Sequence, residues 1–226
     1  MASARLIHIV IATAALVWAG MLLAEGTPLH WEFLRPYELV AASVVVAVNV
    51  YDWWLWRKWP IVYVSPVPLI RGTWQGELRS SWVDPQTGQA VPPVKVYLAV
   101  QQTAGSLNIR LFTPSSASAS TTASVSNDGG VGLLTTTYRN IPDLLQRATS
   151  PIHNGTMLLE VPERFPKRLK GSYWTDRSSQ GEIVFDRRSP KVAADLLGAR
   201  SLKFDNGVVV SRPTWLGGTS RAKPAR

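Results

Sequence analysis

The chain has 226 residues, of which 46% are hydrophobic and 17% charged, and it contains ten tryptophans. This composition is too apolar for a disordered chain. There is no cysteine, which excludes a disulfide framework, a thiolate zinc site and a cysteine nucleophile, and agrees with a protein that faces the cytosol. The formal net charge is +9, and nine basic residues stand against two acidic ones between positions 187 and 226. We expect this segment to be a solvated basic tail, or to contact anionic lipid headgroups or a phosphate ligand.

Two long apolar runs lie in the first quarter of the chain, from Leu6 to Ala24 and from Leu39 to Leu55. Each approaches the roughly 20 residues that a helix needs to cross a bilayer. A signal peptide has a shorter apolar run and is not followed at once by a second one. The sequence therefore predicts a two-helix transmembrane hairpin over residues 1–59, with residues 25–38 as its outer turn.

Basic residues flank this predicted hairpin, whereas its turn is acidic. Arg5 precedes the first run and Arg57 and Lys58 follow the second, while the turn has Arg35 alone against three glutamates. Since cytoplasmic flanks carry the excess of Lys and Arg, we expect the N-terminus and everything after residue 59 to lie in the cytosol. Tryptophans 53, 54, 56 and 59, beside Arg57 and Lys58, predict a belt at the headgroup level.

Two polar residues interrupt the second apolar run. Asn49 lies deeper, and its amide is expected to hydrogen-bond either a second protomer or the other helix of the hairpin. Asp52 adjoins the tryptophans and is expected at the membrane interface. Asn49 is therefore the candidate oligomerisation residue.

After Pro60 the apolar pattern changes to a period of two, and turn signals recur at short intervals. We expect eight short, mostly antiparallel strands, over residues 72–82, 94–101, 107–111, 115–126, 131–138, 156–161, 169–175 and 181–186. Residues 141–148 have a weak helical pattern, and a short helix is also expected between residues 189 and 200. The strand pattern fits either a small closed barrel or a sandwich.

The sequence contains no motif of enzyme chemistry. His8, His30 and His153 lack metal-ligand spacing, and no Walker A loop, G-x-S-x-G or G-x-G-x-x-G sequence occurs. We therefore expect a protein that is not an enzyme, without a catalytic residue, a metal site or a cofactor.

Two short segments have distinctive patterns. Gly-x-Trp-x-Gly, from Gly72 to Gly76, resembles the motif whose tryptophan closes the base of lipocalin-type barrels, which predicts Trp74 as a plug at a barrel end. Tyr-Trp-Thr-Asp-Arg-Ser-Ser-Gln-Gly-Glu-Ile begins at Tyr173 and predicts a tight hairpin. In that hairpin Asp176 is expected to bond turn amides, and Arg177 to pair with Asp176 or a phosphate.

These motifs and the order of the segments resemble the two-transmembrane β-barrel effectors of CBASS, a bacterial anti-phage system that signals through cyclic oligonucleotides. The resemblance covers roughly residues 6–187. It implies a membrane-anchored all-β protein whose small eight-stranded antiparallel lipocalin-like barrel, residues 60–188, is followed by a short helix and basic tail, residues 189–226.

The same resemblance implies a function. A cyclic dinucleotide made by a nucleotidyltransferase would activate the protein, which would form a homo-oligomer and disrupt the lipid of the bacterial inner membrane. No nucleic acid polymer is expected as a partner.

A cyclic dinucleotide has two phosphates and two flat bases, so its receptor needs cations or amide donors beside stacking surfaces. Near one mouth of the implied barrel we expect ligand contacts from Arg79, Tyr97, Arg110, Tyr173, Thr175 and Arg177. Because strand alternation sends Tyr173 and Trp174 to opposite faces, only one of them can enter the lumen.

A different class of function also fits these segments: a membrane-tethered lipocalin-like carrier of a small apolar ligand, or a structural membrane anchor. The carrier predicts a lumen lined by aliphatic groups, whereas the nucleotide sensor predicts arginines inside the barrel.

Overall fold

The computed structural model describes residues 34–65, 67–83, 88–128, 131–148 and 150–205, together with residues 15, 18, 20, 24 and 26. All eight predicted strands and the second apolar run lie within these ranges. Most of the first apolar run, and the basic tail after residue 205, lie outside the described residues.

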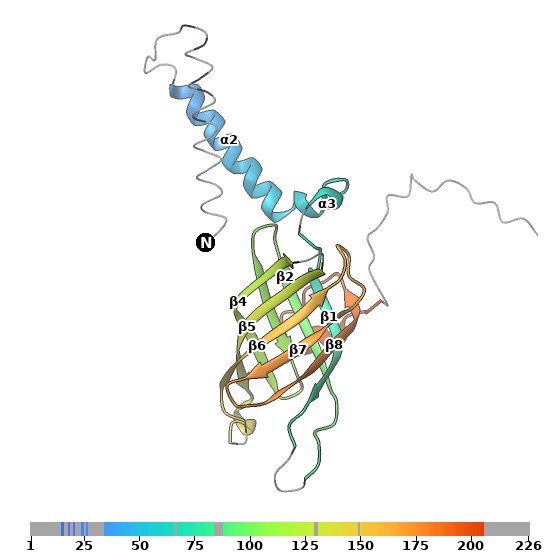
Figure 1. Cartoon of the computed structure of the whole chain (residues 1–226). Coiled ribbons are helices and arrows are strands. Elements are labelled where there is room, and N and C mark those ends of the chain that lie inside the picture. Colours follow the sequence, from blue (N-terminus) through green and yellow to red (C-terminus); the bar gives the residue numbers. More distant parts are fainter. Residues whose placement is uncertain are drawn as a thin grey trace, which may run out of the picture.

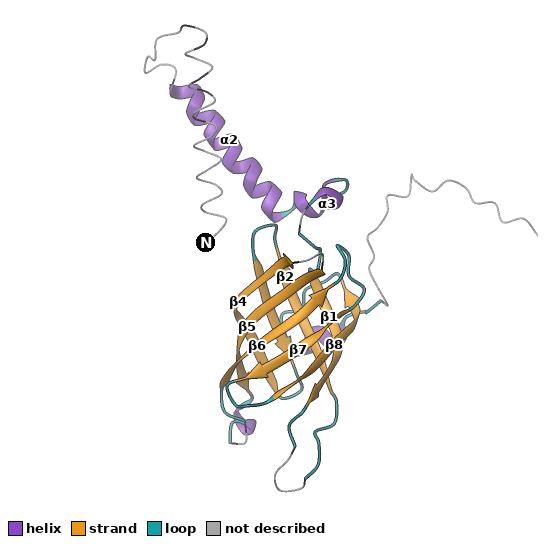
Figure 2. Ribbon diagram, viewed as in Figure 1, coloured by secondary structure: helices purple, strands orange, loops and turns teal. Residues whose placement is uncertain are grey.

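Eight antiparallel strands form a closed barrel, in which each strand pairs with its neighbours in sequence and β8 closes against β1 (Figures 1 and 2). The strands are β1 (Gly72–Ser80), β2 (Val94–Gln102), β3 (Leu107–Phe112), β4 (Ser116–Asp128), β5 (Val131–Pro142), β6 (His153–Val161), β7 (Leu169–Thr175) and β8 (Gln180–Ser189). The prediction of an eight-stranded antiparallel barrel is confirmed, and the closed ladder excludes the sandwich.

The barrel interior is a packed apolar core. Trp74, Leu98, Leu134, Leu159 and Phe185, from five different strands, are each 0% exposed and belong to one contiguous cluster. Their positions follow the alternation of side chains along a strand. The nucleotide sensor predicts arginines inside the barrel. Among the described residues one arginine is buried, Arg188, and it lies at the end of the barrel, over the ring of Trp74.

The tryptophan of the Gly-x-Trp-x-Gly motif closes the end of the barrel at which β1 begins. Its indole Nε1 donates a hydrogen bond to the carbonyl oxygen of Ile70 (2.8 Å), and the guanidinium of Arg188 lies over its ring. Trp74 is thus the plug that the motif predicts.

The weak helical pattern of residues 141–148 does not form an α-helix. Ile141 still pairs with Ala117, so β5 continues to Pro142, and a single 3₁₀ turn, η3 (Leu144–Gln146), follows. Pairing with β4 outweighs the local preference of a segment this short. The short helix α4 (Leu196–Ser201) comes after β8 and packs Ala199 against the outer side of β2.

The helical segments described between residue 34 and the barrel are α2 (Leu34–Trp53), η2 (Leu55–Arg57) and α3 (Ile61–Val64). Figure 1 shows α2 projecting from one end of the barrel. Within the described part of the chain, no helix combines the length and the apolar character needed to cross a membrane. The two-helix membrane hairpin therefore stays a prediction.

Candidate ligand site

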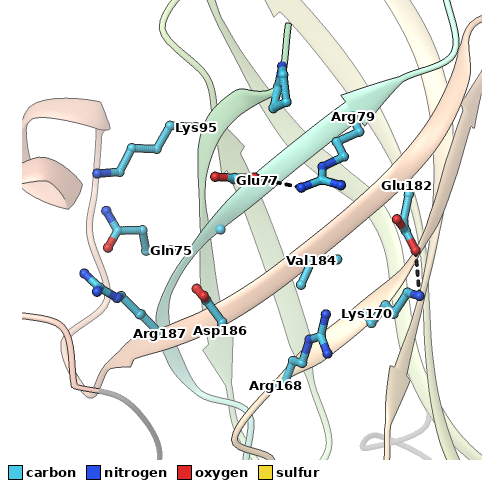
Figure 3. A pocket seen from close by; sticks show the side chains of 12 residues that line it. Gln75, Glu77, Arg79, Lys95, Arg168, Lys170, Glu182, Val184, Asp186 and Arg187 are labelled. Carbon is cyan, nitrogen blue, oxygen red and sulfur yellow. Dashed lines mark ion pairs between the residues drawn. The ribbon is translucent and has the colours of Figure 1, made fainter.

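A groove of about 570 Å³ crosses the outer wall of the barrel over β2, β1, β8 and β7 (Figure 3). This volume falls within the range of roughly 300 to 1,000 Å³ typical of small-molecule sites. Its basic side chains are Arg79, Lys95, Arg168, Lys170 and Arg187, and its acidic ones are Glu77, Glu182 and Asp186. The groove is therefore charged, with cations in excess.

The alternation along β1 explains why its polar side chains reach the groove. Trp74 and Leu78 face the core, so Gln75, Glu77 and Arg79 face outward. The same rule places Lys95 on the outer side of β2, opposite Glu77 in the ladder.

A β-bulge in β8 adds two neighbouring charged side chains to the groove. Pairing with β1 steps from Gly76 opposite Phe185 to Gln75 opposite Arg187, so Asp186 has no direct partner on β1. Asp186 and Arg187 are consequently both exposed, because a bulge interrupts the alternation. A Cβ at Gly76 would run into the backbone of Phe185 and the residue before it, so glycine allows β1 to approach the bulged strand closely.

Two ion pairs occupy part of the groove. Arg79 Nη2 lies 3.5 Å from Glu77 Oε2, and Lys170 Nζ lies 2.7 Å from Glu182 Oε1. The hydrogen bond and the charge of Lys170 lower the pKa of the Glu182 carboxyl. All four side chains are solvent-exposed, so these pairs contribute little to stability.

The remaining cations are available to a ligand. The ammonium of Lys95 lies over the Tyr97 ring, 6.0 Å from its centroid, and forms no ion pair with a described residue. The side chains of Arg168 and Arg187 form no hydrogen bond or ion pair with any described residue. An anion can therefore bind here without displacing an existing ion pair. Phosphate oxygens are favoured partners, since arginine binds them through charge-assisted, bidentate hydrogen bonds.

Three of the predicted ligand residues lie on the outer wall of the barrel. Arg79 lines the groove, Arg110 donates to the carbonyl oxygen of Ala194 (2.7 Å), and Tyr97 is buried against Phe204. The expectation that they gather at one barrel mouth is wrong, because aliphatic side chains occupy the inward positions of these strands.

The other three predicted residues lie in β7 and the turn that follows it. Tyr173 faces the interior, and burial raises the pKa of its phenol, partly opposed by a side-chain hydrogen bond. The Thr175 and Ser179 hydroxyls are hydrogen-bonded (2.7 Å), and Arg177 Nη1 donates to Ser150 Oγ (2.8 Å). None of the three lines the groove.

The hairpin itself differs in one bond from its prediction. Asp176 Oδ2 accepts from the backbone N–H of Asn154 (2.9 Å), so it joins the turn to the start of β6 rather than bonding the amides of its own turn. A second hollow of about 390 Å³ lies beside it, with Trp174, Thr156 and Thr137 in its lining.

The site residues predicted from the sequence do not include Lys95, Arg168, Lys170 and Arg187. Alternation alone indicates that Lys95 points outward, but nothing local shows that four particular strands share one wall. That neighbourhood depends on the closure of β8 against β1 and on the bulge.

A closed antiparallel barrel with a charged groove in its wall is a ligand-binding domain. Residues 65–187 match the family model described as Cap15, cyclic dinucleotide receptor domain. The match spans more than half of the chain and coincides with the barrel, so the chain belongs to this family of CBASS effectors. The suspected resemblance is thus confirmed. None of the curated proteins compared with the chain matches it.

Proposed function

We propose that this protein is a CBASS effector that binds a cyclic dinucleotide in the groove, assembles, and disrupts the bacterial inner membrane through its N-terminal helices. The observation that carries the proposal is the match of a cyclic dinucleotide receptor family to the barrel. The groove supplies the charge that such a ligand requires.

The cations of the groove form two groups, which suits a ligand with two phosphates. Figure 3 shows Lys95 and Arg187 toward one end and Arg79 and Arg168 toward the other, with carboxylates between them. Each phosphodiester can accept charge-assisted hydrogen bonds from one group. The carboxylates are acceptors for the N–H groups on the base edges.

Among the described residues, no aromatic side chain lines the groove, so recognition there depends on charge and hydrogen bonds rather than on stacking. Affinity should therefore fall as salt concentration rises. A ligand held on an outer wall stays partly exposed, and a second barrel can contact it. Such a bridged ligand favours the associated state, which is the condition for driving assembly.

Two features of α2 support its association with a neighbouring helix. Asn49 Nδ2 donates to the carbonyl oxygen of Val45 within the helix (2.7 Å), which leaves its amide oxygen for a neighbouring helix. Ala42 and Ala47 are exposed small residues that permit close helix packing. Two helices enclose no pore, so several hairpins must come together. We place the N-terminus and the barrel in the cytosol, where a nucleotidyltransferase makes the ligand.

Binding of a panel of cyclic dinucleotides to the full chain tests the ligand and its site together. Arg187→Ala and Lys95→Ala should each weaken the tightest binder by about 10- to 150-fold, the equivalent of one charge-assisted contact. Arg200→Ala, an exposed arginine on α4, is the matched control.

Arg177→Ala separates the groove from the site expected from the sequence. Loss of binding in Arg177→Ala, with Arg187→Ala unaffected, would move the ligand to the β7–β8 turn. If every cyclic dinucleotide of the panel fails to bind, the ligand assignment is refuted.

Leakage from liposomes tests the membrane step. The full chain should release trapped dye when the binding nucleotide is added, while residues 60–226 should bind the nucleotide without leakage. Release of dye by residues 60–226 alone would contradict the proposal that the N-terminal helices disrupt the membrane.

The carrier alternative has less support. The lumen is lined by apolar groups, as a carrier predicts, but those side chains are almost fully buried against one another. An apolar ligand would have to displace them, at the cost of the packing that closes the barrel.

A further inference from the structure

The last turn of α2 is hydrogen-bonded to the β2–β3 turn of the barrel through one residue. Asp52 Oδ1 accepts from the backbone N–H of Gly105 (2.6 Å) and from Thr103 Oγ1 (3.1 Å). The backbone carbonyl of Asp52 accepts from the N–H of Ala104 (3.1 Å). From the sequence we expected Asp52 at the membrane interface. In the structure its carboxylate is hydrogen-bonded to the β2–β3 turn of the barrel.

The turn that Asp52 holds is itself well fixed. The N–H of Thr103 donates to the carbonyl of Ser106 (2.9 Å), and Ser106 donates from its own N–H to Thr103 Oγ1 (3.0 Å). The turn directly connects β2 to β3, both of which are part of the closed barrel. Asp52 is therefore bonded to a rigid edge of the barrel and not to a loose loop.

The segment between α2 and β1 is attached to the barrel at two further points. The Gln102 side chain accepts from the N–H of Ile70 (2.9 Å) and donates to the carbonyl of Pro68 (2.8 Å). Arg164, in the β6–β7 loop, donates to the carbonyls of Val62 (3.2 Å) and Ser65. With Asp52, these contacts hold the segment from η2 to β1 against one end of the barrel.

We propose that Asp52 is the positioning residue that joins α2 and the barrel into one rigid unit. The inference rests on the proposed function for its consequence: when barrels assemble, the arrangement of the barrels also sets the direction in which each α2 points. If α2 were on a flexible tether, assembly of the barrels would only raise the local concentration of the helices. A helix held by Asp52 also gains a defined orientation toward its neighbours.

The ligand groove and the Asp52 contact share a strand. Lys95 lies near the start of β2, and Thr103 follows its last residue. A nucleotide that fixes β2 against a second barrel thereby fixes the edge to which α2 is bonded. Asp52 accepts three hydrogen bonds, of which the two at its carboxylate are charge-assisted, and this suits the holding role.

Distances between two spin labels test the rigidity without any ligand. Since the chain has no cysteine, Val46→Cys on α2 and Ser172→Cys on β7, both exposed, give two unique labelling sites in the full chain in lipid nanodiscs. We expect a narrow distance distribution in this labelled parent. Asp52→Ala should broaden it roughly twofold or more, as for a flexible tether.

Two controls define what the aspartate contributes. Asp52→Asn keeps an oxygen acceptor, so its distance distribution should be nearly as narrow as that of the parent. Asp143→Ala removes an exposed aspartate that makes no capping bond at η3, and should leave the distribution unchanged. If Asp52→Ala fails to fold, Asp52→Glu, which displaces the carboxylate by one methylene group, takes its place.

A distribution as narrow in Asp52→Ala as in the parent, with the barrel folded, would overturn the proposal. Leakage supplies the second readout: Asp52→Ala should retain the affinity for the binding nucleotide but lose most of the dye release, and Asp52→Asn should restore it. If the parent neither binds nor leaks, the proposed function fails, while the spin-label distances still decide the role of Asp52.

Discussion

The guanidinium of Arg188 lies over the indole of Trp74, with Cζ 5.0 Å from the ring centroid, and donates a hydrogen bond to the carbonyl of Arg71 (2.6 Å). The two residues face each other in the ladder of β1 and β8, the pair of strands that closes the barrel. Burial, together with the positive charge of Arg71, lowers the pKa of Arg188 to about 10. Arg188 is thus still charged at neutral pH, and its charge lies over the face of the plug.

Replacing Trp74 tests the contribution of this plug. Trp74→Ala should lower the free energy of unfolding of residues 60–226 by about 3 to 5 kcal/mol, because it leaves a large cavity in the core. Urea denaturation followed by circular dichroism measures the change. Trp174→Ala is the matched control: this outward-facing tryptophan is 45% exposed and should cost much less. Equal losses in both variants would show that Trp74 is not a core residue.

Gly76→Ala tests the close approach of β1 to the bulged strand β8. The added methyl group would meet the backbone of β8, so the strands must separate and the barrel should lose more than about 2 kcal/mol. Gly88→Asn is the control. Gly88 has φ of 67°, no atom of another described residue lies near its missing Cβ, and asparagine tolerates that conformation. Loss of nucleotide binding in Gly76→Ala with unchanged stability would point to the groove instead.

The buried tyrosines predict a loss of stability at alkaline pH. Burial first, then the charges of Tyr173 and Asp176, raise the pKa of Tyr138 well above its usual value. In the unfolded chain this phenol loses its proton near pH 10, whereas in the folded barrel it keeps it, so stability falls as the pH rises through about 10. Tyr138→Phe should reduce this fall by up to about 1.4 kcal/mol per pH unit.

The quantity to measure is the difference in unfolding free energy between the parent and Tyr138→Phe. Arg188 changes the stability of both proteins with pH, in the direction opposite to Tyr138. The folded pKa of Arg188, about 10, is below its unfolded value, so its deprotonation at high pH favours the folded state. Unfolding free energies measured between about pH 8 and 11 give the comparison. Parallel pH profiles for the parent and Tyr138→Phe would mean that Tyr138 ionises normally.

The charge pattern around the apolar runs predicts the topology in the membrane. A reporter enzyme fused after Arg226 should be active only in the cytosol. A second fusion, placed in the turn between residues 25 and 38, should be active only outside it. Activity of the C-terminal fusion in the periplasm would contradict the sensor function as well, since the nucleotide is made inside the cell.

Local patterns were enough to find the strands. The alternation of Val94, Val96 and Leu98 with polar neighbours, and the turn residues between such segments, predict both where a strand lies and which side faces the core. The plug role of Trp74 was also visible, because its motif places it at the start of the first strand. These features depend on residues close together in the sequence.

Most residues of the candidate groove could not be predicted from local sequence patterns. Arg79 was expected near a barrel mouth, together with Tyr97 and Arg110. It lines the groove on the outer wall, and the other two lie elsewhere on that wall. Residues 141–148 have a helical pattern because a segment this short has too few residues to distinguish the period of a helix from that of a strand.

The order of polar and apolar residues along this chain determined the number of strands, their antiparallel course and their inward faces. The closure of β8 on β1, the bulge at Asp186 and the contact between Asp52 and Gly105 emerged only in the folded molecule. Each of them joins residues separated by about 50 or more positions, and the energy of such a contact exists only once the intervening chain has folded. A charged groove and a fixed helix are therefore properties of the closed barrel, not of any one of its segments.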